Sequence, residues 1–299
     1  MSLNDEVIGN IRKTTSHKNV KLTDSGNKAI YAAFYYLRET GYKQIIIPDQ
    51  GGWITYKQYP KKLKLDIIEL KTDNGLVIMK ELESVCKTAQ KLSEDGKGKT
   101  AFIVTSLAGY FADQDLKMIS EVCKKYGVLL IEDTNAYGYD FDDNKLCNGK
   151  LADIIVGSFG KWKVVNNKHG GFISAKNKEV MDVLEKSERV KEKIKPKELD
   201  ELKLLQNLEL AHERLLFLIE TCEQLKKELL GMDLNVLHKD KKGVVVVVSF
   251  KDDKSKDKII DYCKRNELEY EECPRYIRVN EKAISIEVKR LEHIGNNDL

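Results

Sequence analysis

Two lysines in a short loop between predicted strands are the residues of this chain best suited to covalent chemistry. The segment contains Ser158, Lys161 and Lys163, and a second strand begins at the pair Gly170 and Gly171. A lysine that is buried or lies near other positive groups has a lowered pKa, so its amine can attack a carbonyl cofactor to form a Schiff base. The serine hydroxyl could bind a phosphate on the same cofactor. Taken alone, a lysine is more often an ordinary surface residue, and the neighbouring segments are what favour the chemical role.

Two adjacent carboxylates, Glu132 and Asp133, end an apolar run that begins at Val128. Ligands of open α/β sheets bind at the carboxyl ends of the strands, where these residues fall. One carboxylate could therefore pair with a protonated ring nitrogen of a cofactor. Adjacent side chains of a strand point to opposite faces, so only one of the two should meet the ligand. A turn or helix cap is the alternative role for a strand-end aspartate.

A third segment, Thr23–Asn27, opens a predicted helix and could bind phosphate. The apolar residues of this helix recur with helical spacing from Ile30 to Leu37, and Gly41 ends the pattern. The free N–H groups and the dipole of a helix N-terminus attract phosphate, although the same residues also make an ordinary helix cap. Trp53, which follows the predicted strand Gln44–Pro48, could stack on a flat cofactor or could simply lie in the core.

Short apolar runs alternate with helical patterns between Thr23 and about Phe172, which predicts βαβ units and a mostly parallel sheet. We expect these runs to be buried parallel strands. They are Gln44–Pro48, Leu65–Leu70, Ala101–Ser106, Val128–Glu132, Ile154–Phe159 and Gly171–Ala175.

The chain changes character after Ala175. Long charged helices are expected from Lys178 to about Lys193 and from Glu198 to Leu230, and the remainder predicts a small α+β domain with strand candidates Tyr276–Val279 and Ala283–Val288. Single cores stop growing at about 250–300 residues, so a chain of 299 residues is long enough for one large domain and a smaller second one. We therefore predict a large α/β domain with an N-terminal arm (1–175), connecting helices (176–232) and a small C-terminal domain (233–299).

Composition argues for a small-molecule ligand. Lys and Arg number 51 and Asp and Glu 48, which leaves a net charge of +3 spread along the helices. A nucleic-acid binder would gather its positive charge on one face. The six cysteines show no metal-ligand spacing, so we predict reduced thiols and no metal. The sequence contains no secretory signal and no long apolar run, which favours a cytoplasmic protein without membrane contact.

In order and approximate spacing, these segments resemble those of the DegT/DnrJ/EryC1/StrS aminotransferases, within the fold-type-I enzymes of pyridoxal 5′-phosphate (PLP) and the aspartate aminotransferase superfamily. The similarity covers roughly Leu22 to Ala175. The matching blocks are Ser25–Lys28, Pro48–Trp53, Ser106–Asp113, Glu132–Gly138 and Ser158–Gly171. The resemblance implies a large domain with a mostly parallel, seven-stranded-type sheet, an aminotransferase activity on a small amino or keto substrate, and a homodimer.

The resemblance also implies roles for individual residues. Asp133 takes the place that pairs with the pyridine nitrogen. The family spacing Ser-Phe-x-x-x-Lys selects Lys163 for the Schiff base, whereas the Ser-x-x-Lys spacing of other fold-type-I aminotransferases selects Lys161. The remaining cofactor-binding positions are Ser25, Gly26, Asn27, Trp53, Asn135 and Ser158.

The sequence departs from the family at Ala136, where family members have Gln or His on the phenolic oxygen of the cofactor. Asn135 or Tyr137 could substitute. A PLP-dependent lyase or aldolase would use the same lysine and aspartate, and a non-catalytic binding or regulatory relative also stays open. Three arginines of the small domain are candidate carboxylate clamps or surface ion-pair residues: Arg275, Arg278 and Arg290.

Overall fold

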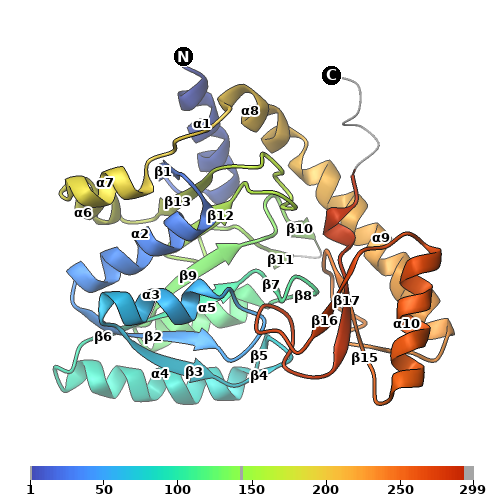
Figure 1. The fold of residues 1–299 in the computed structure, drawn as a ribbon. Coiled ribbons are helices and arrows are strands. Elements are labelled where there is room, and N and C mark those ends of the chain that lie inside the picture. The colour runs from blue at the N-terminus through green and yellow to red at the C-terminus, as the bar shows by residue number, and fades with distance from the viewer. Residues whose placement is uncertain (1, 142–143, 293–299) are drawn as a thin grey trace.

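A seven-stranded sheet forms the centre of the larger part of the molecule (Figure 1). The computed structural model describes residues 2–141 and 144–292. The strand order is β1-β13-β12-β9-β6-β2-β3, and β3, β2, β6, β9 and β12 run parallel. This arrangement confirms the predicted fold class. The bounds are β1 (Asn19–Thr23), β2 (Tyr42–Pro48), β3 (Asp66–Leu70), β6 (Lys99–Thr105), β9 (Leu129–Thr134), β12 (Ile154–Ser158) and β13 (Gly171–Ala175).

Two details of the sheet differ from the prediction. β13 was expected to be parallel but runs antiparallel to both of its neighbours, β12 and β1. A fully buried strand has the same apolar pattern in either direction, and direction depends on the connection. The segment between β12 and β13 contains no crossover helix, which a parallel pair would need. β1 was not predicted, because only its last two residues are buried.

Helices cover both faces of the sheet. One apolar core lies under α2 (Gly26–Glu39), α3 (Thr55–Leu63), α6 (Glu179–Glu185) and α7 (Glu188–Ile194). The other core lies under α1 (Leu3–Thr15), α4 (Met79–Glu94) and α5 (Leu116–Lys125), and it continues into the small C-terminal part of the chain. The single helix expected from Lys178 to Lys193 is thus two helices, which join at Lys186 and Ser187.

The C-terminal part is built on a second sheet. Helices α8 (Glu201–Glu209) and α9 (Ala211–Gly231) lead to it, where one helix was expected. The strand order is β14-β15-β17-β16, all antiparallel. The elements are β14 (Asn235–Val236), β15 (Val246–Ser249), α10 (Asp253–Arg265), β16 (Tyr270–Cys273), β17 (Ala283–Ile286) and the 3₁₀ turn η1 (Val288–Arg290). The two separate sheets support the predicted division into large and small domains, which we retain as our proposal.

One predicted strand of the small domain is wrong. Tyr276–Val279 forms a turn, closed by backbone hydrogen bonds from Arg275 N to Val279 O and from Arg278 N to Arg275 O, both 2.8 Å. The strand lies earlier, at Tyr270–Cys273. Strand-like residue types predicted extended backbone here, but the turn buries the Arg278 side chain in an ion pair.

Backbone hydrogen bonds join the small domain to two loops of the large one. Gly51 N donates to Tyr276 O at 2.8 Å, just after β2. Val244 N donates to Tyr110 O at 2.8 Å, at the turn between β7 (Leu107–Ala108) and β8 (Ala112–Asp113). Tyr110 has a positive φ of 73°, a conformation uncommon for a residue with a side chain. These contacts fix the small domain beside the carboxyl ends of the parallel strands.

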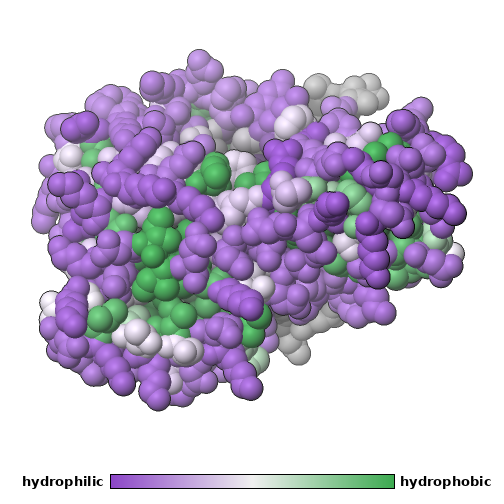
Figure 2. All heavy atoms as spheres, turned by 60° about the horizontal axis from the view of Figure 1, so that its bottom comes forward, coloured by the Kyte–Doolittle hydropathy of each residue, from purple (hydrophilic) through white to green (hydrophobic). Residues whose placement is uncertain are grey.

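The surface is mainly hydrophilic, as the face in Figure 2 shows, with an apolar area on the large-domain side. Strand β3 forms a free edge of the sheet, and its Ile67 and Ile68 are half-buried. Within the described ranges, none of the helices has the length and apolar character needed to span a membrane.

Candidate active site

One cavity lies where β2, β9 and β12 end and where α2 begins. The structure brings most of the predicted site residues to it. The cavity has a volume of about 90 Å³. Its lining includes Ser25, Gly26, Asn27, Trp53, Asp133, Asn135, Ser158 and Lys163, together with Ile30, Tyr110 and Thr134, which were not predicted.

The N-terminus of α2 forms one wall of the cavity. Ser25 is the N-cap, and its hydroxyl accepts a hydrogen bond from Lys28 N at 3.4 Å. Gly26 is packed so closely against β12 that an added Cβ would lie 2.5 Å from Ser158 Cβ. The first turn of α2 contains no acidic residue. The dipole of α2 and the N–H groups of Gly26 and Asn27 could therefore bind an anion beside the Ser158 hydroxyl, whereas Lys28 N is engaged by Ser25.

The two candidate lysines have different environments. Lys163 is half-buried and lines the cavity, where its Nζ donates a hydrogen bond to the Tyr110 hydroxyl and lies 4.9 Å from the centroid of the Trp53 ring. Lys161 is exposed, and its Nζ lies 4.5 Å from the centroid of the Trp162 ring. The geometry therefore favours Lys163 for chemistry in this cavity.

Asp133 faces Lys163 and is held by a tyrosine. The Tyr56 hydroxyl, which is fully buried, donates a hydrogen bond of 2.6 Å to Asp133 Oδ2. Burial raises the pKa of the Asp133 carboxyl, while the Tyr56 hydrogen bond and the Lys163 charge oppose that rise. Burial and the Asp133 charge raise the pKa of Tyr56 well above its usual value, so the phenol remains a donor. The second oxygen of Asp133 is thus the one left for a ligand.

Glu132 points away from the cavity, as strand alternation predicted. Its buried carboxylate accepts hydrogen bonds from the Ser106 hydroxyl at 2.6 Å, Cys147 N at 2.6 Å and Asn148 N at 3.3 Å. Burial nevertheless raises the pKa of Glu132 to about 7. This side chain thus fastens the loop at Cys147 and Asn148 to the sheet.

Replacing Glu132 with Gln is expected to change how stability depends on pH. Because the pKa of Glu132 is raised from 4.5 to about 7, the folded protein keeps this proton at pH values where the unfolded chain has lost it. The group should therefore lower the free energy of unfolding as the pH rises through this interval, by about 3 kcal/mol at most. Gln does not titrate, so thermal unfolding of both proteins at several pH values should show a steeper decline for the wild type. If the stability of the two proteins declines equally with pH, the raised pKa of Glu132 would be contradicted.

The two residues proposed to compensate for Ala136 are engaged elsewhere. The Asn135 amide lines the cavity but accepts a hydrogen bond from Leu107 N at 2.8 Å and donates one to Leu107 O at 2.9 Å. The Tyr137 hydroxyl donates to Asn10 Oδ1 at 2.9 Å, and its ring packs among core phenylalanines. Asn135 therefore remains the better placed of the two, and Tyr137 has a structural role.

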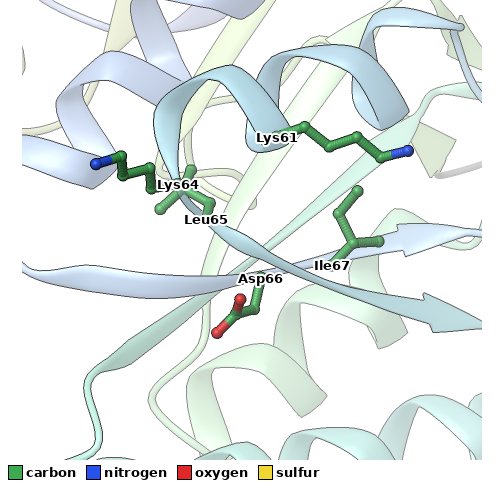
Figure 3. A pocket seen from close by; sticks show the side chains of 5 residues that line it. All are labelled: Lys61, Lys64, Leu65, Asp66 and Ile67. Carbon is green, nitrogen blue, oxygen red and sulfur yellow. The ribbon is translucent and has the colours of Figure 1, made fainter.

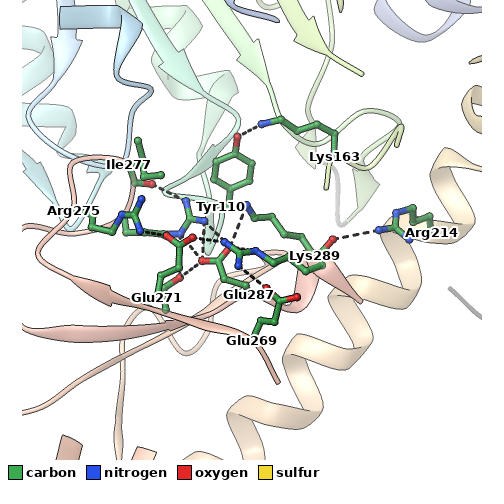
Figure 4. Close-up of polar contacts among 12 residues, drawn as sticks. Tyr110, Lys163, Arg214, Glu269, Glu271, Arg275, Ile277, Glu287 and Lys289 are labelled. Carbon is green, nitrogen blue, oxygen red and sulfur yellow. Dashed lines mark hydrogen bonds and ion pairs between the residues drawn. The ribbon is translucent and has the colours of Figure 1, made fainter. Parts of the chain in front are cut away.

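The three arginines proposed as carboxylate clamps are paired with glutamates (Figure 4). Arg278 is 1% exposed and forms a double ion pair with Glu287. Arg275 pairs with Glu271, and Arg290 pairs with Glu269 and Glu271. These pairings match the alternative prediction of ion-pair residues, but Arg278 is buried, whereas that prediction had it at the surface.

Three further residues, of which only Tyr110 lines the cavity, contact the site and were not singled out from the sequence. Tyr56 holds Asp133, Tyr110 holds Lys163, and Lys289 lies with its Nζ 4.7 Å from the centroid of the Tyr110 ring. Tyr110 lies in the segment Ser106–Asp113, which resembles the family, so the sequence could have indicated it as a site residue. Tyr56 and Lys289 have no local sequence signal, since both reach the site through tertiary packing.

A second hollow lies at the turn between α3 and β3. Lys61, Lys64, Leu65, Asp66 and Ile67 line it. The two lysines extend in opposite directions (Figure 3), so their charges do not converge on a ligand. Binding pockets usually combine apolar walls with a few convergent polar groups, which favours the cavity at Lys163.

The chain shares its fold with solved enzymes of the fold-type-I PLP class. Serine palmitoyltransferase of Sphingomonas wittichii superposes with a TM-score of 0.74 at 11% identity, over 95% of this chain and 70% of that protein. SepCysS, in a complex with the N-terminal domain of SepCysE, gives a TM-score of 0.70 at 17% identity, over 98% of this chain and 81% of that one. At such identities the likeness concerns the fold.

Residues 70–193 match the DegT/DnrJ/EryC1/StrS aminotransferase family, which confirms the predicted resemblance over this stretch. The blocks Ser25–Lys28 and Pro48–Trp53 lie outside the matched residues. Residues 212–296 match a second family, the MJ1341 family C-terminal domain. A UDP-4-amino-4,6-dideoxy-N-acetyl-beta-L-altrosamine transaminase of Campylobacter jejuni serotype O:2 is 31% identical over 120 residues, or 40% of this chain. The match spans 29% of the length of that relative.

Proposed function

We propose that this chain is a PLP-dependent aminotransferase that acts on a small amino or keto substrate through Lys163. The observation that carries the proposal is the convergence of Lys163, Asp133 and the N-terminus of α2 on one cavity. The family match over residues 70–193, which includes this lysine and this aspartate, supports the same function.

The groups around the cavity suit the three functional parts of PLP. The N-terminus of α2 and Ser158 would hold the phosphate, Asp133 would hold the ring nitrogen, and Lys163 would bind the carbonyl carbon. The cavity of about 90 Å³ is smaller than most ligand pockets, roughly 300–1,000 Å³. Lys163 extends across it between Tyr110 and Trp53, so these side chains would have to make room for the ring.

When bound, PLP supplies an electron sink for the bond electrons at the substrate carbon. The residues of the chain do the remaining work. Asp133 holds a proton at the ring nitrogen, and Tyr56 orients the Asp133 carboxylate. The Lys163 amine can carry a proton to and from the substrate carbon once it is released from Tyr110. Trp53 shields one side of the lysine from solvent.

Addition of PLP to the purified protein tests the proposal. The protein should become yellow, lose the visible band on reduction with borohydride, and carry the label on one lysine. Incubation of the yellow protein with glutamate should release 2-oxoglutarate, which separates amino transfer from a lyase or aldolase reaction. A protein that ignores PLP would overturn the proposal.

We also propose that the chain is a homodimer. Beside the cavity, Ile54 is 43% exposed, and three half-buried tyrosines form a ring cluster on α2 and α3. They are Tyr31, Tyr35 and Tyr59. Aromatic residues are enriched where interfaces bury their cores.

Light scattering should therefore give twice the mass of the chain across a range of concentrations. Substitution of Ile54 by Lys at this surface is expected to weaken the dimer, whereas the same change at Met118 on α5, which is 47% exposed, should leave it intact. A wild-type mass that remains monomeric at every concentration would contradict the proposal.

A further inference from the structure

The tryptophan between the two candidate lysines has a backbone conformation that rarely suits a bulky side chain. Trp162 lies in the loop that joins β12 to β13, residues 159–170, which we call the lysine loop. Lys163 N donates to Gly160 O at 3.3 Å and closes a turn of four residues, of which Trp162 is the third, with a φ of 64°. A positive φ at the third position of a turn is ordinarily adopted by glycine or asparagine. Contacts of the tryptophan side chain must therefore outweigh the strain.

Two cationic side chains lie against the Trp162 ring. Arg290 Cζ and Lys161 Nζ are each 4.5 Å from the ring centroid, within the distance at which a cation attracts an aromatic face. Arg290 belongs to the small domain, whereas Lys161 is a neighbour in the lysine loop. The sequence suggested other roles for both residues, a carboxylate clamp and a Schiff base, and the structure brings both to this ring.

Arg290 is the more firmly fixed of these two cations. Its side chain is 14% exposed, its Nη1 lies 2.6 Å from Glu269 Oε2, and its Nη2 pairs with Glu271. The two glutamates lie just before and within β16, so the guanidinium is anchored to the sheet of the small domain. Lys161 is exposed and has no such anchor on the sheet. The contact with Arg290 therefore joins the lysine loop to the small domain.

The backbone of the lysine loop is held separately. Trp162 N donates to Asn166 Oδ1 at 3.1 Å, and Asn167 N donates to Phe159 O at 2.9 Å. At position 162 this hydrogen bond uses the backbone alone, so any residue other than proline could make it. The contact with Arg290 is the part that requires an aromatic ring.

We propose that Trp162 is a positioning residue that acts through Lys163. The ring, held by Arg290, keeps the positive φ at residue 162, and this φ sets the direction in which the next residue leaves the turn. In the observed conformation Lys163 enters the cavity and its amine reaches the Tyr110 hydroxyl. The inference rests on the proposed function, since this position matters to catalysis only if Lys163 carries the chemistry.

Replacing Trp162 with Gly or with Phe separates the ring from the backbone. Glycine adopts a positive φ freely but has no ring, whereas Phe keeps a ring and is as poorly suited to this φ as Trp. The rate at which PLP becomes linked to the cofactor-free protein is followed by quenching with borohydride and weighing the product. Trp162→Gly should slow the link by about tenfold to a hundredfold, the effect of a small misplacement of a reacting group, and Trp162→Phe should stay near the wild type.

The order of the two variants decides the question, at a temperature where circular dichroism shows each of them folded. If Trp162 served only the turn, Gly would be the better replacement, because it removes the strain. A Trp162→Gly protein that forms the link as fast as Trp162→Phe, or faster, would overturn the inference.

Arg290→Lys tests the partner of the ring. Lysine keeps the positive charge but lacks the planar guanidinium that stacks on aromatic rings. The change should slow the link when Trp162 is present and add little once Trp162 is Gly, because residues that act through one contact are not additive. Exposed Arg265→Lys on α10 is the matched control and should have no effect. Fully additive effects of Arg290→Lys and Trp162→Gly would contradict the inference.

Acetylation of the cofactor-free protein gives a readout that does not depend on PLP. Lys163 is half-buried with its amine bonded to Tyr110, so it should react more slowly than exposed Lys161. Trp162→Gly should raise the Lys163 rate toward that of Lys161, and Trp162→Phe should leave it low. This pattern in a protein that ignores PLP would overturn the proposed function and support the positioning role. A yellow protein whose Gly and Phe variants are acetylated equally at Lys163 would support the function and overturn the inference.

Discussion

Replacing Lys163 with Ala should abolish the borohydride-stable link to PLP and all amino transfer. Lys163 lines the cavity with its amine held by Tyr110 and close to Trp53, whereas Lys161 is exposed. The remaining contacts at the start of α2 and at Ser158 could still hold the phosphate, so PLP should bind reversibly. The measurement is the mass of the reduced protein, with and without the cofactor.

Lys161→Ala is the matched control, since it removes an amine two residues away in the same loop. It should retain the visible band, the covalent label and most of the activity. Because both lysines fall on neighbouring peptides, fragmentation by tandem mass spectrometry must locate the label in the wild type. If the label is found on Lys161, or if only Lys161→Ala loses the label, then the Ser-x-x-Lys spacing applies and Lys161 forms the Schiff base.

Replacing Asp133 with Asn should slow the half-reaction with glutamate by about two to three orders of magnitude, the usual effect of removing a preorganised electrostatic partner. The amide has the shape of the carboxylate, and its oxygen can still accept from the Tyr56 hydroxyl. Its NH₂ group would then face the cavity without a negative charge. An opposite charge at hydrogen-bond distance commonly shifts a pKa by about one to three units, so the ring nitrogen should lose its proton more easily.

Asp133→Asn should still bind PLP and form the link to Lys163, so the loss should be in the rate of the half-reaction, followed by its spectral change. Glu132→Gln is the control, because Glu132 points to the opposite face and bonds the loop at Cys147. That variant should react at nearly the wild-type rate at a temperature where it is folded. A damaging Glu132→Gln with a silent Asp133→Asn would show that the wrong carboxylate had been assigned.

The sequence predicted the large sheet well because buried parallel strands form short apolar runs that recur between helical patterns. It could not give the direction of β13, since a strand buried on both faces has the same pattern either way. The turn at Tyr276–Val279 was missed for another reason. Its conformation depends on Arg278 reaching Glu287, a partner nine residues later.

The candidate site divides in the same way. Lys163, Asp133 and the start of α2 could be found because each follows the end of an element that the sequence pattern predicts. Tyr56 could not, since it is one of several tyrosines on α2 and α3, and only folding brings its hydroxyl to Asp133. Lys289 is one of 51 basic residues, and its position depends on how the small domain packs against Tyr110.

The turn that carries Tyr110 is also where the small domain is attached. Val244 N donates to Tyr110 O, and the side chain of the same residue holds the Lys163 amine. One residue therefore links the backbone attachment of the small domain to the side chain that positions the lysine. The position of the lysine amine is thus tied, through a single tyrosine, to how the small domain is attached.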